Sequence, residues 1–205
     1  MKPLNFAAIV LAAGGSTRMG QPKQLLPVAG RSLVRRIADA VLASPANPVV
    51  VVLGAGAEAI RSEIAALPVV IVENTEWEEG LAASIRSGVR ALESLSPPPD
   101  AAALILCDQP NLTPDALARL AEEYSRSGRS IVAARYDGHP GPPALFARRH
   151  FPELLALRGP GGARPLLRRH ADTLATVDLP EMAVDLDNPS DYRKFVAPPF
   201  NQPLR

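Results

Sequence analysis

Residues 11–23 read LAAGGSTRMGQPK and carry three glycines and two cationic side chains directly after an apolar run. A glycine-rich turn between a strand and a helix exposes backbone N–H groups, and the absence of side chains lets a phosphate approach closely. The glycine spacing does not fit the dinucleotide fingerprint G-x-G-x-x-G. A P-loop would place its lysine directly after Gly20, whereas here the lysine stands at position 23. The turn therefore predicts an anion site of a different kind.

Short apolar runs alternate with segments of helical periodicity along the rest of the chain. Each run is continuously apolar, which is typical of strands covered on both faces, as in a mostly parallel sheet. The expected strands are residues 7–12, 48–53, 68–72, 102–107 and 130–134. The expected helices are residues 31–43, 57–66, 80–94 and 114–127, the last with Thr113 as its N-cap. This alternation predicts an α/β fold with a Rossmann-like sheet and helices on both faces.

The composition of the chain argues against several functional classes. Lys plus Arg number 22 and Asp plus Glu 21, so bulk charge gives no support for a nucleic-acid or membrane-surface partner. The single cysteine, Cys107, excludes an intramolecular disulfide and a cysteine-based zinc site, and it favours a reducing, cytoplasmic location. No apolar segment approaches the roughly 20 residues that a membrane-spanning helix needs.

We expect one domain over residues 1–197 and a proline-rich tail over residues 198–205. Residues 135–165 are rich in glycine and proline and look less regular than the rest. Either an insertion that covers a ligand site or an ordinary surface loop would give this pattern. His150 and His170 are expected on surface helices without a functional role.

The thirteen residues of the opening stretch resemble the signature L-A-[AG]-G-x-S-x-R-M-G-x-x-K of nucleotidyltransferases with the MobA-like fold. Further segments are similar to motifs of that family, among them WEEGLAASI at 77–85 and CDQP at 107–110. The others lie at 138–146, 157–164 and 185–192, so the resemblance covers roughly residues 7 to 195. It implies a single-domain fold of the nucleotide-diphospho-sugar-transferase type.

The resemblance also implies an activity. C-D-Q-P is typical of the molybdopterin cytidylyltransferase branch, and the guanylyl branch more often has glycine where Ala13 stands. The implied reaction transfers CMP from CTP to molybdopterin with Mg²⁺ as cofactor, releases pyrophosphate and forms molybdopterin cytosine dinucleotide. The expected recipient is a molybdoenzyme of the xanthine-dehydrogenase type or its chaperone. Two alternatives remain open: a relative that uses GTP or a sugar or alditol phosphate, and a non-catalytic chaperone that binds the molybdenum cofactor.

Candidate roles follow from residue chemistry and from the resemblance together. Arg18 and Lys23 are the expected catalytic cations, since they can neutralise a triphosphate and the charge that develops at its α-phosphate. Asp108 closes a strand and is the expected Mg²⁺ ligand; the resemblance implies Asp187 as the second. The expected nucleotide-binding residues are Leu11, Ala12, Ala13, Gly14, Gly15, Lys23, Gly80, Ser84 and Asp108.

The acceptor side is expected to include His139, Gly141, Arg164 and Asp185. The chain departs from the family pattern here, because Pro160 stands where the motif G-D-x-G-A-R has an aspartate. A carboxylate is therefore missing from this side. An acceptor phosphate is already anionic at neutral pH, so the reaction requires no general base.

Overall fold

The computed structural model describes residues 4–197, in which seven strands form one twisted sheet in the order β5-β4-β1-β6-β8-β7-β9. The strands are β1 (Phe6–Ala12), β4 (Val49–Leu53), β5 (Val70–Glu73), β6 (Ala101–Leu106), β7 (Ile131–Tyr136), β8 (His139–Ala147) and β9 (Ala175–Asp178). A separate two-stranded hairpin pairs β2 (Pro27–Val28) with β3 (Arg31–Ser32). The predicted tail at 198–205 lies outside the described residues.

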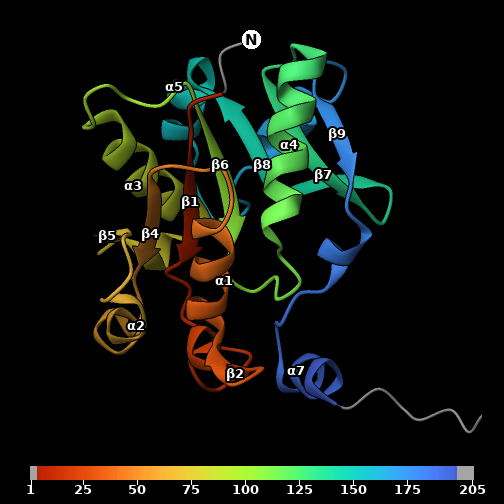
Figure 1. The fold of residues 1–205 in the computed structure, drawn as a ribbon. Coiled ribbons are helices and arrows are strands. Elements are labelled where there is room, and N and C mark those ends of the chain that lie inside the picture. The colour runs from red at the N-terminus through yellow and green to blue at the C-terminus, as the bar shows by residue number, and fades with distance from the viewer. Residues whose placement is uncertain (1–3, 198–205) are drawn as a thin grey trace, which may run out of the picture.

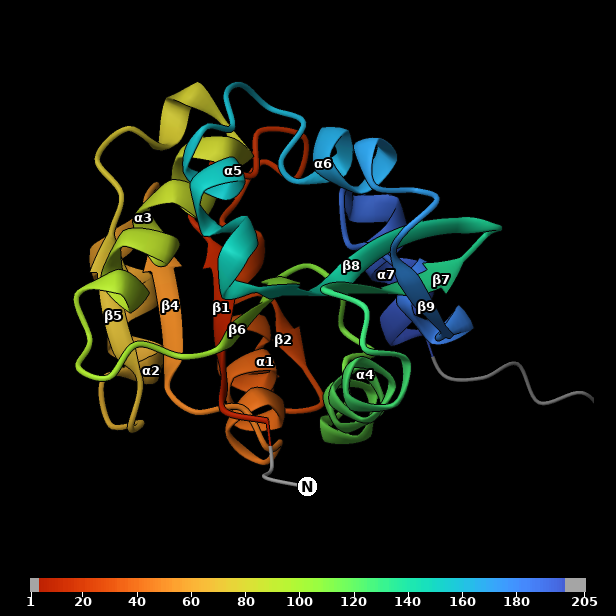
Figure 2. The ribbon, with the colours of Figure 1, turned by 90° about the horizontal axis from the view of Figure 1, so that it is seen from above.

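Helices cover both faces of the sheet, as Figure 2 shows. They are α1 (Leu33–Leu42), α2 (Ala57–Ile64), α3 (Leu81–Glu93), α4 (Pro114–Ser127), α5 (Phe151–Leu155), α6 (Arg164–Arg169) and α7 (Pro189–Val196). Short 3-10 turns are η1 (Lys23–Leu25), η2 (Trp77–Glu79), η3 (Arg148–His150) and η4 (Pro180–Ala183). One apolar core joins the sheet to α1, α2 and α4, and a second joins it to α3, α5 and α6.

The predicted fold class is confirmed. All five expected strands and all four expected helices are present, and β1 pairs in parallel with β4 and β6 on its two sides. Thr113 caps α4, because its side chain accepts a hydrogen bond from the backbone N–H of Ala116 at 3.2 Å. The arrowheads of β1, β4 and β6 point to the same end of the sheet (Figure 1).

Two strands were not expected from the sequence. β8 contains three prolines, which disfavour a strand, yet it runs antiparallel between β6 and β7. The β7–β8 pairing shifts register at Ala133/Ala134, and a two-residue turn with positive φ at Asp137 and Gly138 closes the hairpin. The expectation of an irregular segment is therefore wrong for much of 135–165, which holds this strand and α5. β9 pairs in parallel with β7 at the edge of the sheet.

Among the described residues, no helix is both long and apolar enough to cross a bilayer. Cys107 is buried at 4% exposure and belongs to the core beneath α1 and α4.

Gly88 allows α3 to approach β1. A Cβ at this position would lie 2.5 Å from Cγ2 of Ile9, a fully buried residue of β1. Close contact of this kind cannot be relieved cheaply, because the surrounding core is tightly packed.

We expect Gly88→Ala to lower the free energy of unfolding by about 1–2 kcal/mol, measured by urea denaturation. Overpacking costs more than alanine gains from its better helix propensity, which is about 1 kcal/mol. Arg90→Ala is the matched control on the exposed face of the same helix, and it should change stability by less than about 0.5 kcal/mol. An unchanged urea midpoint for Gly88→Ala would contradict the close packing of α3 on β1.

Candidate active site

The candidate site lies at the carboxyl ends of β1 and β6. The chain leaves β1 toward β4 and β5, then returns to place β6 on the other side of β1. Open α/β sheets bind ligands where the strand order reverses in this way. The glycine-rich turn after β1 and Asp108 after β6 therefore meet at one edge of the sheet.

Gln24 holds the glycine-rich turn in shape. It is 1% exposed, and its amide nitrogen donates to the carbonyl oxygens of Ala12 at 2.9 Å and Gly14 at 2.8 Å. Its amide oxygen accepts a hydrogen bond from the hydroxyl of Ser16, which in turn accepts from the backbone N–H of Lys23. Gln24 was not predicted as a site residue, because its only signal in the sequence is a polar side chain directly before the apolar pair at 25–26.

Two glycines permit the close packing behind the turn. A Cβ on Gly15 would lie 2.9 Å from the Trp77 ring, and one on Gly54 would lie 2.7 Å from the carbonyl oxygen of Ala13. The methyl group of Ala13 lies 2.8 Å from the same added atom on Gly54. The backbone after β1 is thus pressed against the segment after β4, and Ala13 is only 3% exposed.

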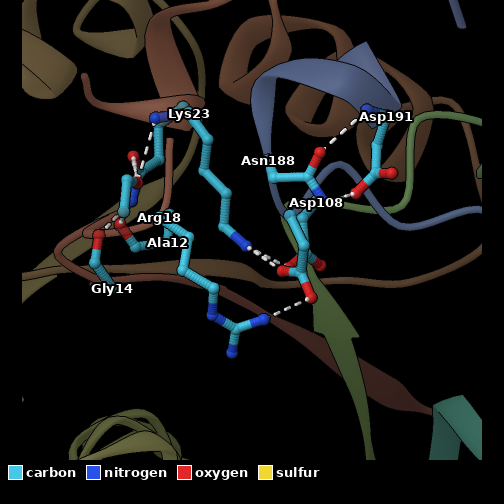
Figure 3. Close-up of polar contacts among 10 residues, drawn as sticks. Ala12, Gly14, Arg18, Lys23, Asp108, Asn188 and Asp191 are labelled. Carbon is cyan, nitrogen blue, oxygen red and sulfur yellow. Dashed lines mark hydrogen bonds and ion pairs between the residues drawn. The ribbon is translucent and has the colours of Figure 1, made fainter. Parts of the chain in front are cut away.

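Lys23 is the centre of a cluster of charges. Its ammonium donates to the carboxylate of Asp108 and to that of Asp187, the latter at 3.2 Å. Figure 3 shows the lysine side chain extending to Asp108. Arg18 reaches Asp187 at 3.5 Å but is 78% exposed, so this outer contact is weak. The structure thus brings together all four residues predicted as catalytic cations and metal ligands.

The C-terminal segment is anchored to this cluster by its own backbone. The N–H of Leu186 donates to the carbonyl oxygen of Asp108 at 2.9 Å. Asn188 caps α7, because its side-chain oxygen accepts from the backbone N–H groups of Ser190 and Asp191, while its amide nitrogen contacts the Asp191 carboxylate (Figure 3). These bonds fix the position of Asp187 at the entrance to the helix.

The electrostatics of the cluster differ from residue to residue. Burial lowers the pKa of Lys23, but the charges of Asp108 and Asp187 outweigh that effect, so the pKa is raised and the lysine stays cationic. Burial, together with the negative charges of Asp108 and Asp187, raises the pKa of Asp185 to about 6. Lys23 thus contacts two carboxylates, and the third, Asp185, lies near enough to be affected by their charge.

Unsatisfied oxygens mark this place as a candidate cation site. Within residues 4–197, one side-chain oxygen of Asp108 and one of Asp185 are buried without a hydrogen-bond partner. Buried polar atoms without partners are uncommon and call for an explanation. Carboxylate oxygens are the ligands that hard divalent cations prefer, so the residues present fit such an ion.

A cavity of about 570 Å³ adjoins the cluster. Its apolar wall includes Leu11, Ile85, Leu104, Leu106 and Leu167. Its lining also includes all four residues predicted for the acceptor: His139, Gly141, Arg164 and Asp185.

Tyr136 also lines the cavity and was not predicted. Its hydroxyl accepts a hydrogen bond from the side chain of Gln109 at 3.2 Å. The same hydroxyl lies 2.4 Å from the position that a Cβ on residue 141 would take. Glycine at 141 is therefore what leaves room for the tyrosine.

The segment before α3 is shaped by Gly80. This glycine has a φ of 113° and leaves no space for a side chain, since a Cβ would lie 2.7 Å from Cα of Pro160. Ser84 is 3% exposed and its hydroxyl accepts from the Asn74 amide at 3.2 Å. Both residues support the wall of the site, and their contact with a nucleotide stays a prediction. Pro160 itself lines the cavity.

The chain is similar to curated proteins with different names. It is 34% identical to "Nicotine blue oxidoreductase" of Paenarthrobacter nicotinovorans over 172 residues, which cover 78% of this chain and 80% of that protein. It is 33% identical to the purine catabolism protein PucB of Bacillus subtilis, with 94% and 96% covered.

Solved structures agree with the fold. Rv0371c of Mycobacterium tuberculosis superposes with a TM-score of 0.79 at 29% identity, covering 94% of this chain and 98% of that one. The same protein has been solved in complex with manganese, and that structure superposes with a TM-score of 0.74 over 95% and 98%. A nucleotidyl transferase from Methanothermobacter thermautotrophicus gives a TM-score of 0.77 at 26% identity, with 93% and 95% covered.

The family model for the MobA-like NTP transferase domain matches residues 8–174, well over half of the chain. This range contains the glycine-rich turn, Lys23 and Asp108, whereas Asp185 and Asp187 follow it. The chain belongs to the MobA-like family of nucleotidyltransferases.

Proposed function

We propose that this chain is a Mg²⁺-dependent cytidylyltransferase that transfers CMP from CTP to molybdopterin and releases pyrophosphate. The observation that carries the proposal is Lys23, a partly buried cation held between two carboxylates where β1 and β6 end, beside a cavity lined by the expected acceptor residues. The family supports a nucleotidyl transfer. The choice of CTP and molybdopterin rests on the sequence motifs and is the part to be tested.

The glycine-rich turn is proposed to receive the triphosphate. Backbone N–H groups and a cationic side chain suit an anion of about four charges, and Arg18 is free to swing because it is largely exposed. Lys23 is far less mobile, with 17% of its side chain exposed. A fixed cation near the α-phosphate stabilises the charge that builds up in the transition state.

The metal is proposed to bind the Asp108 oxygen that Lys23 leaves unpaired, with Asp187 as the second ligand and Asp185 beside them. The partnerless buried oxygens of Asp108 and Asp185 support this position. Bound Mg²⁺ would neutralise phosphate charge and orient the phosphate oxygens. Manganese takes similar oxygen ligands, in keeping with the manganese complex of Rv0371c.

The cavity is proposed to hold the acceptor. An apolar wall and the cations Arg164 and Arg168 fit a ligand with a flat ring system and a phosphate. The acceptor phosphate attacks the α-phosphorus of CTP, a new P–O bond forms, and the bond to the leaving pyrophosphate breaks. No side chain has to remove a proton, because the acceptor is already an anion. Catalysis is then positioning and charge stabilisation.

Selection of the base is proposed to act through packing. Neither Ala13 nor Cys107 offers much surface, since they are 3% and 4% exposed. The methyl group of Ala13 instead packs toward Gly54 and sets the course of the backbone after β1. Any effect of Ala13 on the choice of base is therefore proposed to act through the position of this backbone, not through contact of the methyl group with the base.

The name of one relative indicates a different activity, that of an oxidoreductase. The glycine-rich turn of this chain does not have the spacing of the dinucleotide fingerprint, and its lysine and carboxylates match phosphate chemistry instead. The chaperone alternative has no use for a lysine held in a strongly charged, buried cluster. Nucleotidyl transfer therefore accounts for more of the site.

The first test is pyrophosphate release by the full chain with Mg²⁺ and molybdopterin, comparing CTP, GTP and ATP. We expect release with CTP, because of the CDQP segment and Ala13. Release with GTP instead would assign the guanylyl activity. No release with any of the three would point to another phosphorylated acceptor or to the binding-protein alternative.

Lys23→Ala should lower turnover by about 10²–10³, the usual scale for losing one charge contact in the transition state. The assay is pyrophosphate release at saturating nucleotide. Lys194→Ala, an exposed lysine on α7, is the matched control and should keep normal turnover. Near-normal turnover of Lys23→Ala would remove the lysine from the mechanism.

Gln24→Leu should raise the Kd for the nucleotide and lower the free energy of unfolding by about 1–3 kcal/mol. The change leaves the buried carbonyl oxygens of Ala12 and Gly14 without the amide donor. Nucleotide titration and urea unfolding measure the two effects. Gln21→Ala, an exposed position in the same turn, should alter neither, and equal behaviour of both variants would show that Gln24 does not hold the turn.

A further inference from the structure

A second cluster of ionisable side chains lies on the α3–α5–α6 face, away from Asp108. His150 ends η3, Glu153 lies in α5, and His170 follows α6. Glu153 accepts from Nδ1 of His150 at 2.8 Å, and its other oxygen lies 3.1 Å from Nε2 of His170. The two rings meet edge to face with centroids 4.9 Å apart. The expectation that His150 lies on the surface is wrong, since it is only 6% exposed.

We propose that His150, Glu153 and His170 form a zinc site of this chain. Two imidazole nitrogens and one carboxylate oxygen are a ligand set that Zn²⁺ uses, with water in the fourth position. The three donor atoms lie within 4.8 Å of one another, and no other group of three His, Cys, Asp or Glu does so among residues 4–197. Because the ligands include two nitrogens, the site favours zinc over Mg²⁺.

The distances require only a small rearrangement. Zinc–ligand bonds of about 2.0–2.2 Å place the donors of a tetrahedral site about 3.3–3.5 Å apart. The Glu153 oxygen that lies 2.8 Å from Nδ1 of His150 also lies 3.3 Å from Nε2 of His170. Only the first of these contacts has to lengthen, by several tenths of an ångström, while the histidines draw together. Arg169 contacts Glu153 at 3.2 Å but is 68% exposed, so it can move into solvent when a cation binds.

The surroundings of His150 support the assignment. Its Nε2 lies 2.8 Å from the hydroxyl of Ser130. A histidine that binds metal through one nitrogen usually gives the other N–H to a fixed acceptor, and Ser130 can be that acceptor while Nδ1 faces Glu153.

A surface depression of about 290 Å³ lies beside the cluster, and Glu153 and Arg169 help to line it. The site also has a structural consequence. α5 packs against α3, whereas α6 carries Arg164 and Arg168 into the wall of the large cavity. Zinc at the cluster would tie α6 to α5 from the end opposite to Arg164. The inference does not depend on the proposed activity.

The test is a titration of the metal-stripped full chain with Zn²⁺ in excess Mg²⁺, using a chromophoric zinc indicator as competitor. We expect one zinc ion per chain. His170→Ala and Glu153→Gln should each weaken binding by at least about tenfold, and Ser130→Ala by about tenfold through the lost outer contact. Circular dichroism checks that each variant is folded; His170 is the safer histidine to change because it is partly exposed.

Two controls separate this site from others. His139→Ala changes the remaining histidine and should leave zinc binding unaltered. Asp108→Asn should also leave it unaltered; loss of zinc in that variant would place the ion at the carboxylates after β6 and overturn the proposal. Absence of bound zinc in the wild-type chain, or unchanged affinity in a folded His170→Ala variant, would equally overturn it and leave the cluster as a polar bridge between helices.

Discussion

The ion pairs of Lys23 join three parts of the chain that are far apart in sequence. The lysine follows β1, Asp108 follows β6 and Asp187 precedes α7, yet one ammonium reaches both carboxylates. Charges withdrawn from water persist only when they are paired, and Lys23 and Asp108 are 17% and 16% exposed. The glycine-rich turn, the end of the sheet and the C-terminal segment therefore hold their positions relative to one another through this cation.

The neutral amide of Gln24 acts beside the ion pairs of Lys23. Gln24 binds the inward carbonyl oxygens of the turn, so the turn does not need a ligand to keep its shape. The two residues therefore have different tasks: the Gln24 amide fixes the backbone of the turn, and the adjacent Lys23 places a positive charge beside it. Preorganised dipoles and charges of this kind lower the barrier to reaction because they do not have to reorient when the transition state forms.

Much of the architecture could be predicted because strands such as β1 and β4 are buried on both faces and so appear as continuous apolar runs. β8 could not, since prolines at 140, 142 and 143 hide a strand whose register is interrupted beside them. The site residues came from a motif, whereas Gln24 and Tyr136 owe their positions to tertiary hydrogen bonds that leave no periodic signal. His150 was misjudged for the same reason, because its burial depends on Ser130 and Glu153.

The two halves of the site are built from different kinds of structure. The half proposed to bind the nucleotide lies at the ends of parallel strands, where loop position is fixed by neighbouring backbones. The half proposed to bind the acceptor is formed by the β7–β8 hairpin and by α6, a helix of six residues. A helix this short is not stable alone and takes its position from the packing of Leu166 and Leu167 in the core. Under the proposed assignment of the cavity to the acceptor, features that hold α6, among them the cluster at His170, influence which acceptor fits without touching the glycine-rich turn.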